Sequence, residues 1–165
     1  METLLSTTLI AATMTTGIAA GVYLLYSFVI MPGLKQTNDH TFVGAFQQID
    51  KVIVGPFLLV FFFGPIVLTA TATALSFGTD EQTALPWIGA ALVLCLAIAV
   101  VTLVVNVPLN NTIDAAGEPD EIADIAGVRE RFRESRWVAS NNIRVVASTV
   151  APGCLAWALV LHERT

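Results

Sequence analysis

Polar side chains that could do chemistry gather in two apolar stretches of the sequence. In the last stretch, four residues at spacings of four, three and four would share one stripe of a helix: Trp137, Asn141, Arg144 and Ser148. In the preceding stretch, Asn106 and Asn110 would share a helix face for the same reason. Amides and a guanidinium inside apolar helices are costly in lipid, so such residues usually face the protein interior and serve function.

The depth of Arg144 makes its surroundings important. It lies eight residues after Arg136, or roughly 12 Å further along a helix that rises about 1.5 Å per residue. A guanidinium at that depth needs partners, and the candidates are Asn106, Asn110, Asn141 and Asp50. Two interpretations stay open. The cluster forms a functional pocket, or Arg144 only braces the helix ends and extends toward the interface.

The elements that must position these residues follow from composition. The chain has 165 residues, of which 55% are hydrophobic and 13% charged, whereas about a quarter of a soluble domain is charged. Four segments carry no Asp, Glu, Lys or Arg: 3–34, 52–79, 82–113 and 145–162. A membrane span needs roughly 20 apolar residues. A soluble helical core is the alternative, but these lengths favour an all-α, integral membrane bundle of four helices forming one domain, residues 1–165.

The expected spans are about 4–31, 52–77, 85–109 and 137–161, with a tight turn at 78–81. Pro32-Gly33 should end the first, Pro65 should kink the second, and Phe61-Phe62-Phe63 should face lipid. Pro108 lacks the N–H that would bond the Val104 carbonyl, so the third should bend there. The segment from Lys35 to about Asp50 should form a short helix lying against the bundle.

Residues 119–136 should form an amphipathic helix between the third and fourth spans. Its expected apolar stripe is Ile122, Ile125, Val128 and Phe132. Such a helix would lie on the membrane surface. Helix three ends where helix four begins, so both polar clusters should lie at one end of the bundle, together with Pro32, Gln47 and Asp50.

Basic residues predict the orientation. Lys35, Lys51 and four arginines of residues 129–136 lie in two short loops, whereas the opposite face has only Arg164. The positive-inside rule therefore places loops 32–52 and 110–136 in the cytoplasm and both termini outside the cytoplasmic membrane.

The sequence gives little support for a metal, haem or dithiol centre. Cys95 and Cys154 lie in apolar spans and form no C-x-x-C pair. His40 and His162 should lie at opposite ends of the bundle, so they cannot bind one metal ion together. We therefore expect no cofactor, no metal and no nucleic-acid partner.

The motifs together resemble a known family. They are Met31-Pro32-Gly33-Leu34, Gln47-x-Ile49-Asp50, Asn106-Val107-Pro108-Leu109-Asn110 and Trp137…Asn141-x-x-Arg144. This pattern resembles the anthrone oxygenase-like family of small integral membrane proteins, over about Gly17 to Ser148. The chain departs from it at Asp50, where Asn is expected, and at Val145, where a hydroxyl residue often follows the arginine.

The resemblance implies a cofactor-independent monooxygenase, an oxidoreductase that converts an anthrone to an anthraquinone. Arg144 and the amides of Asn106, Asn110 and Asn141 would hold the developing negative charge. Asp50 would be the base. Trp137 would stack on the flat substrate, which reaches the site from the lipid bilayer, and the other expected substrate contacts are Gln47, Tyr26 and Ser148.

Two other functions remain open from the sequence. The chain could be a non-catalytic membrane subunit or assembly factor, with the G-x-x-x-G face of Gly17 and Gly21 binding a second copy or another membrane protein. It could also bind or transport a small molecule, although we find no internal repeat of the kind that transporters often carry.

Overall fold

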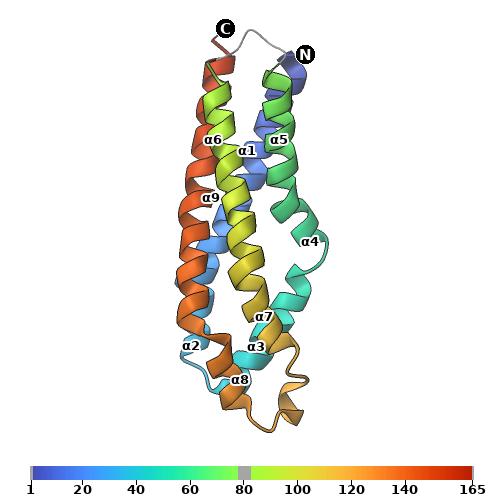
Figure 1. Cartoon of the computed structure of the whole chain (residues 1–165), viewed down its shortest axis with the longest axis vertical. Helices are drawn as coiled ribbons and strands as arrows, with labels where there is room; N and C mark the ends of the chain where they lie inside the picture. The colour runs from blue at the N-terminus through green and yellow to red at the C-terminus, as the bar shows by residue number, and fades with distance from the viewer. Residues whose placement is uncertain (1, 78–82, 165) are drawn as a thin grey trace.

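The computed structural model describes residues 2–77 and 83–164, and within them the chain is helical without β-strands. Four helical stretches are long and apolar enough to cross a membrane: Glu2–Lys35, Leu59–Ser76, Leu85–Asp114 and Ile125–His162. Figure 1 shows them side by side, with both termini at one end. The predicted all-α four-helix bundle is confirmed, and its apolar helices suit an integral membrane protein. The turn expected at 78–81 lies outside the described residues.

The four long helices pack in a closed ring. Helix α1 (Glu2–Leu25) packs against α9 (Glu134–His162) and α5 (Gly64–Ser76), and α6 (Leu85–Val101) also packs against α9 and α5. At the end with the termini, the ring encloses a cluster of buried apolar side chains that includes Leu5, Leu9, Ile88 and Leu155. This half of the bundle is a conventional packed core.

Three of the four spans contain a π-helical segment, and each segment ends two residues before a proline. The segments are η1 (Tyr26–Ile30), η2 (Leu59–Phe63) and η3 (Thr102–Asn106), and the prolines are Pro32, Pro65 and Pro108. A proline has no N–H for the carbonyl four residues earlier, and its ring clashes with that carbonyl. The wider π turn accommodates both effects, and π segments frequently occur at functional sites.

The π segments change where two helices begin and end. Pro32-Gly33 does not end the first span, because η1 absorbs the proline and α2 (Met31–Lys35) continues the helix. The second span does not begin at Val52. Helix α3 (Asp39–Ile53), the expected short helix, occupies that position and is followed by Val54 and the extended Gly55. A residue before proline avoids the α conformation, so the span begins with α4 (Pro56–Leu58), which lies away from the bundle axis in Figure 1.

The third and fourth spans are each longer at the end that lies away from the termini. Helix α7 (Val107–Asp114) carries the third span past Leu109, and α9 starts at Glu134. The predicted amphipathic helix at 119–136 is shorter than expected. It consists of a 3-10 turn, η4 (Pro119–Glu121), and α8 (Ile125–Phe132), which Arg133 separates from α9 by its left-handed backbone (φ 53°).

The apolar stripe of α8 faces the protein. Val128 and Phe132 are buried, and Ile122 and Ile125 pack against the same second core cluster. Helix α8 contacts α3 and α7. The stripe therefore packs against the end of the bundle, and the amphipathic helix expected between the third and fourth spans is present there. Its position on a membrane surface stays a prediction.

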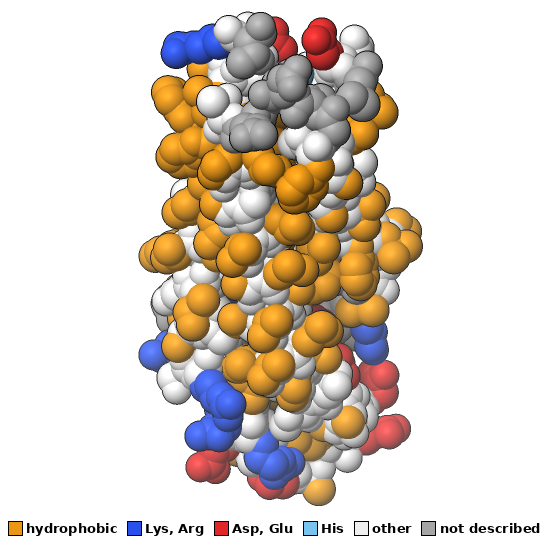
Figure 2. Space-filling model, turned by 45° about the horizontal axis from the view of Figure 1, so that its top comes forward, with side chains coloured by type: hydrophobic (Ala, Val, Ile, Leu, Met, Phe, Trp, Pro, Cys, Tyr) orange, Lys and Arg blue, Asp and Glu red, His pale blue; other side chains and the backbone are white. Residues whose placement is uncertain are grey.

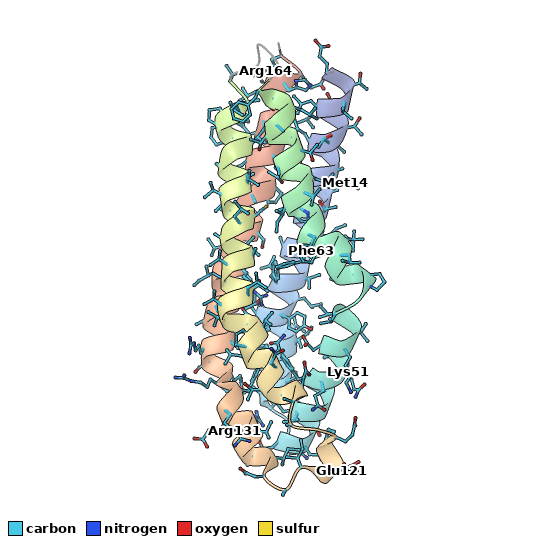
Figure 3. The ribbon with its side chains drawn as sticks, turned by 45° about the vertical axis from the view of Figure 1, so that its right-hand side comes forward. Met14, Lys51, Phe63, Glu121, Arg131 and Arg164 are labelled. Carbon is cyan, nitrogen blue, oxygen red and sulfur yellow. The ribbon has the colours of Figure 1, made fainter. Side chains whose placement is uncertain are left out.

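The charged side chains on the described surface lie toward the two ends of the molecule. Figure 2 shows a mainly hydrophobic middle, with charges above and below it. In Figure 3, Lys51, Glu121 and Arg131 lie at the end opposite Arg164, while Met14 and Phe63 lie between the two ends. Because lipid tails cannot solvate charge, the apolar middle is the part suited to a bilayer.

Gly17 and Gly21 do not serve close helix packing within this chain. A Cβ atom added at either position would meet no other atom within 4 Å. Both glycines are exposed on α1. Docking of a second copy or a partner on this face stays a prediction.

Candidate functional site

A cavity of about 150 Å³ lies between the two apolar clusters of the bundle. All three π segments contribute to its wall: Tyr26 comes from η1, Phe61 and Phe62 from η2, and Thr102 and Asn106 from η3. Its exposed lining residues are Val54, Phe57 and Val107. The cavity therefore opens to the outside between α4 and α7, where the chain departs from the regular ring.

Arg144 enters the cavity wall from α9 with its charge almost wholly buried (7% exposed). Its Nη2 donates to Oδ1 of Asn141 at 2.6 Å, and its Nη1 donates to Oγ1 of Thr102 at 3.3 Å. Among the described residues no carboxylate forms an ion pair with it. A buried charge with only neutral partners is costly, so this site favours an anion.

Two aromatic rings flank the guanidinium. The Cζ atom of Arg144 lies 4.7 Å from the centroid of the Tyr23 ring and 5.5 Å from that of Trp137. Both distances suit cation–π attraction, which strengthens when the pair is desolvated. The rings fix the plane in which the guanidinium can meet a ligand.

Asn141 anchors Arg144 to the first span. Its Nδ2 donates to the Tyr23 carbonyl at 2.9 Å and to Oγ of Ser27 at 2.6 Å. Both amide hydrogens are thus used, and Oδ1 is left to accept from Arg144. Asn141 is therefore a positioning residue, and it holds the guanidinium in one orientation.

Two buried polar atoms in the cavity wall have no partner. They are Nε of Arg144, a donor, and Oδ1 of Asn106, an acceptor. The Nδ2 atom of Asn106 donates to the Trp137 carbonyl in a long hydrogen bond of 3.4 Å. Buried polar atoms are rarely left unpaired, so a ligand offering an acceptor and a donor would complete this wall.

A hydrogen-bonded chain leads from Trp137 to a carboxyl group at the cavity mouth. The Nε1 atom of Trp137 donates to Oδ1 of Asn110 at 2.7 Å, and Nδ2 of Asn110 donates to Oδ1 of Asp50 at 2.8 Å. Burial raises the pKa of Asp50 to about 6, and a hydrogen bond to Asp114 and its charge act in the same direction, against the lowering by Asn110. Asp50 can therefore take and release a proton near neutral pH.

Trp137 forms the floor of the cavity. It is 3% exposed, and the rings of Tyr26, Phe46 and Phe132 lie 5.6, 6.0 and 6.3 Å from it between centroids. These contacts hold the indole fixed between the Asp50–Asn110 pair at Nε1 and Arg144 over its ring.

The structure brings most of the predicted site residues together. Seven line the cavity: Arg144, Asn141, Asn106, Asn110, Asp50, Trp137 and Tyr26. Gln47 does not, because its Nε2 donates to the carbonyls of Ile113 and Gly117, both at 2.9 Å. Ser148 also lies outside it and donates to the carbonyl of Val145 at 3.2 Å.

Several lining residues were not found from the sequence. Tyr23 and Thr102 hold Arg144, and Phe61 and Phe62 line the cavity although the run was expected to face lipid. Only Phe63, 46% exposed, faces outward. The signal that was available is the proline two residues after the run, because it predicts a local change in helical phase.

No group of three or more His, Cys, Asp or Glu within the described parts of the chain could hold a metal ion. The polar inventory of the cavity is one guanidinium, amides, hydroxyls and one carboxyl. It suits the binding of an organic oxyanion and the transfer of a proton.

Comparison with known proteins gives one finding. A family model described as anthrone oxygenase matches residues 57–154, more than half of the chain. No curated protein and no solved structure matches the chain. The matched segment contains Asn106, Asn110, Trp137, Asn141 and Arg144, whereas Tyr23, Gln47 and Asp50 precede it. The chain, with its four apolar helices and its arginine-walled cavity, belongs to the anthrone oxygenase family.

Proposed function

We propose that this protein is a membrane-embedded, cofactor-independent oxygenase that oxidises a planar polycyclic aromatic such as an anthrone to the quinone. The observation that carries the proposal is the guanidinium of Arg144, buried without a carboxylate in the wall of an aromatic-lined cavity. Family membership supports the proposed reaction class. The site gives each residue its role.

The reaction needs a base and a place for negative charge. An anthrone has a carbonyl on one side of its central ring and an acidic CH₂ group on the opposite side. Removal of a proton from that CH₂ group gives an enolate whose charge lies largely on the carbonyl oxygen. The catalyst must therefore act on both sides of one ring.

The contacts of Trp137 support such an arrangement. Asp50 reaches the indole of Trp137 through Asn110, and Arg144 lies over the ring of the same indole. A flat substrate lying beside Trp137 would present its CH₂ group to Asp50 and its oxygen to Arg144. The unpartnered Nε–H of Arg144 would then donate to the enolate oxygen, where a preorganised donor has its largest effect.

The unpartnered Oδ1 of Asn106 adds a specificity contact. It accepts a hydrogen bond, so it favours a substrate that carries a hydroxyl group close to its carbonyl. This hydroxyl group would donate a hydrogen bond to Oδ1 of Asn106, the second atom of the cavity wall that has no partner. We therefore propose a hydroxylated anthrone as the preferred substrate.

The redox balance requires only dioxygen. The enolate transfers one electron to O₂, and the resulting radical and superoxide combine into a peroxide at the former CH₂ carbon. Loss of the remaining hydrogen at that carbon as a proton breaks the O–O bond and leaves a second carbonyl group. One oxygen atom ends in the quinone and the other in water, so O₂ takes up four electrons and the substrate supplies them.

The dimensions of the cavity bear on how the substrate binds. A cavity of about 150 Å³ equals one that holds a single benzene ring in a protein core. A three-ring substrate must therefore extend through the opening at Val54, Phe57 and Val107. This opening lies next to the apolar middle of the molecule, so we propose that the substrate enters from the bilayer.

The distribution of basic residues supports an orientation. Figure 3 shows Lys51 and Arg131 at one end of the molecule and Arg164 at the other. The remaining basic residues lie in or next to α2, α8 and the first turn of α9, at the same end as Lys51: Lys35, Arg129, Arg133 and Arg136. We propose, by the positive-inside rule, that the end with α3 and α8 faces the cytoplasm. Asp50 would then exchange its proton with the cytoplasm.

The proposal is tested by oxygen uptake and quinone formation in purified protein stripped of flavin and metal ions. One mole of O₂ consumed per mole of quinone, at a rate well above spontaneous autoxidation, is the expected result. Isotopically labelled O₂ should place one labelled atom in the quinone. Uptake at the spontaneous rate with hydroxylated and unsubstituted anthrones would contradict the proposal and favour a non-catalytic membrane subunit.

A further inference from the structure

A second, much smaller cavity adjoins the first on its inner side. It has a volume of about 20 Å³, enough for one molecule the size of water. Four residues line both cavities: Ala19, Tyr23, Phe61 and Phe62. The remaining lining residues come from all four spans and include Thr16, Pro65, Cys95, Ile98 and Ser148. None of the lining residues is exposed.

The lining of this small cavity does not suit water. Three of its lining residues carry a hydroxyl group. Two of these hydroxyls already donate within their own helices, Thr16 to the Ala12 carbonyl at 2.6 Å and Ser148 to the Val145 carbonyl at 3.2 Å, and the third belongs to Tyr23, whose ring also borders the substrate cavity. The other named walls are apolar side chains, aromatic rings and the thiol of Cys95. A buried water typically makes about three hydrogen bonds, and apolar cavities stay dry and take up apolar molecules.

We propose that this small cavity is a dioxygen site that supplies the substrate cavity. The inference rests on the proposed function, because an oxygenase without a cofactor has no metal ion or flavin to gather O₂. Dioxygen is apolar and dissolves readily in the hydrocarbon of a bilayer. A dry pocket of one-molecule size in the apolar half of the bundle holds it beside the bound aromatic substrate.

The shared wall also explains how O₂ becomes reactive. The guanidinium of Arg144 lies over the ring of Tyr23, which lines both cavities. Electron transfer from a delocalised enolate requires O₂ near the ring system, and superoxide forms beside this fixed positive charge. The charge favours the electron transfer and draws superoxide into the substrate cavity, where the new C–O bond forms.

Cys95 provides a matched pair of variants for the test. It is 3% exposed, and it lines the small cavity but not the substrate cavity. Cys95→Leu replaces one sulfur by three carbons and fills the cavity, whereas Cys95→Ala enlarges it. Both variants remove the thiol, so any difference between them reports on the space.

The first measurement does not depend on activity. The paramagnetic relaxation that O₂ causes is measured in methyl-labelled protein in lipid nanodiscs. The probe is Ile98, which lines the small cavity. The controls are Ile88, which is buried but lines none of the described cavities, and Val100, which is exposed on the lipid-facing surface. We expect relaxation at Ile98 to exceed that at Ile88, and Cys95→Leu but not Cys95→Ala to remove the excess while Val100 is unchanged. Equal relaxation at Ile98 in all three proteins would overturn the dioxygen site.

The second measurement is steady-state oxygen uptake. Cys95→Leu should raise the KM for O₂ several-fold relative to Cys95→Ala, and the two variants should have the same KM for the aromatic substrate. A several-fold rise in both KM values in Cys95→Leu would show distortion of the substrate cavity and overturn the assignment. If the relaxation excess is present but no anthrone is oxidised, the gas site stands and the proposed function fails.

Discussion

The Nε1–H group of Trp137 donates a 2.7 Å hydrogen bond to Oδ1 of Asn110, and this contact determines which way the amide of Asn110 points. Since Oδ1 faces the indole, Nδ2 is turned toward Asp50, to which it donates at 2.8 Å. The indole thus orients the proposed base through one amide. Arg144 lies over the face of the same indole, so one rigid ring contacts both the proposed oxyanion donor and the amide that holds the proposed base.

Replacing Trp137 by Phe should impair the base while leaving the substrate wall in place. The ring is kept, but Oδ1 of Asn110 loses its donor and the amide is free to turn. We expect kcat to fall about tenfold, the value of roughly one hydrogen bond, with little change in the KM for anthrone. A KM that rises while kcat stays constant would show that Trp137 only binds substrate.

The pH dependence of turnover should report the ionisation of Asp50. Its pKa is about 6 and only the carboxylate accepts a proton, so activity above the spontaneous rate should rise through about pH 6 and level off above it. Asp50→Asn should remove both the activity and the inflection. An unchanged profile in this variant would exclude Asp50 as the base.

The variant Asp114→Asn is the matched test of what raises that pKa. An amide at position 114 removes a negative charge and can donate to the carboxylate, so the pKa of Asp50 should fall and the inflection should move to lower pH.

The stability of the wild-type protein should also depend on pH through Asp50. Because the folded state holds the Asp50 proton more tightly than the unfolded state, the free energy of unfolding should fall between about pH 4 and 6 and then level off. Thermal unfolding in detergent would show a flatter curve for Asp50→Asn.

Asn106→Leu should separate function from stability. The amide makes one long hydrogen bond and leaves Oδ1 unpaired, so its loss should change the free energy of unfolding by less than about 1 kcal/mol. The KM for a hydroxylated anthrone should rise about tenfold, whereas an anthrone without the hydroxyl should be affected much less. Equal effects on both substrates would argue against a contact to that hydroxyl.

Gln47→Leu should show the opposite pattern. Gln47 joins α3 to the carbonyls of Ile113 and Gly117 at the end of α7, and its removal breaks both of these hydrogen bonds, although the Ile113 carbonyl still accepts from the Ala116 N–H. We expect a loss of about 2 kcal/mol in the free energy of unfolding and near-normal turnover in the protein that remains folded. Normal stability with lost turnover would return Gln47 to the substrate site.

Much of this fold is predictable from the sequence because its signals are local. Charge-free segments give the four spans, and helical spacing brings Trp137, Asn141 and Arg144 to one stripe. Antiparallel order then brings Asn106 and Asn110 to the same end. These inferences need only the period of a helix and the number of spans.

The inner wall of the cavity is harder to predict because three π segments shift the phase of the helices that form it. Phe61 and Phe62 turn inward for this reason, and Thr102 meets Arg144. Ser148 keeps the predicted stripe but lies eleven residues beyond Trp137, which carries it past the substrate cavity to the smaller one. Gln47 is at the predicted end of the bundle, yet the carbonyls that it binds lie in the last turn of α7 and in the loop after it, which no sequence pattern revealed.

The most direct test of the account is anthrone-dependent oxygen uptake by wild-type protein and by Arg144→Gln, after subtraction of spontaneous autoxidation. Gln keeps hydrogen-bonding capacity toward Asn141 and Thr102 but removes the positive charge. Loss of a preorganised donor to an oxyanion typically costs a factor of about a hundred to a thousand in kcat, and we predict a loss of that size in a variant that remains folded by gel filtration and thermal unfolding. Uptake above the spontaneous rate that is equal in the two proteins would contradict the account.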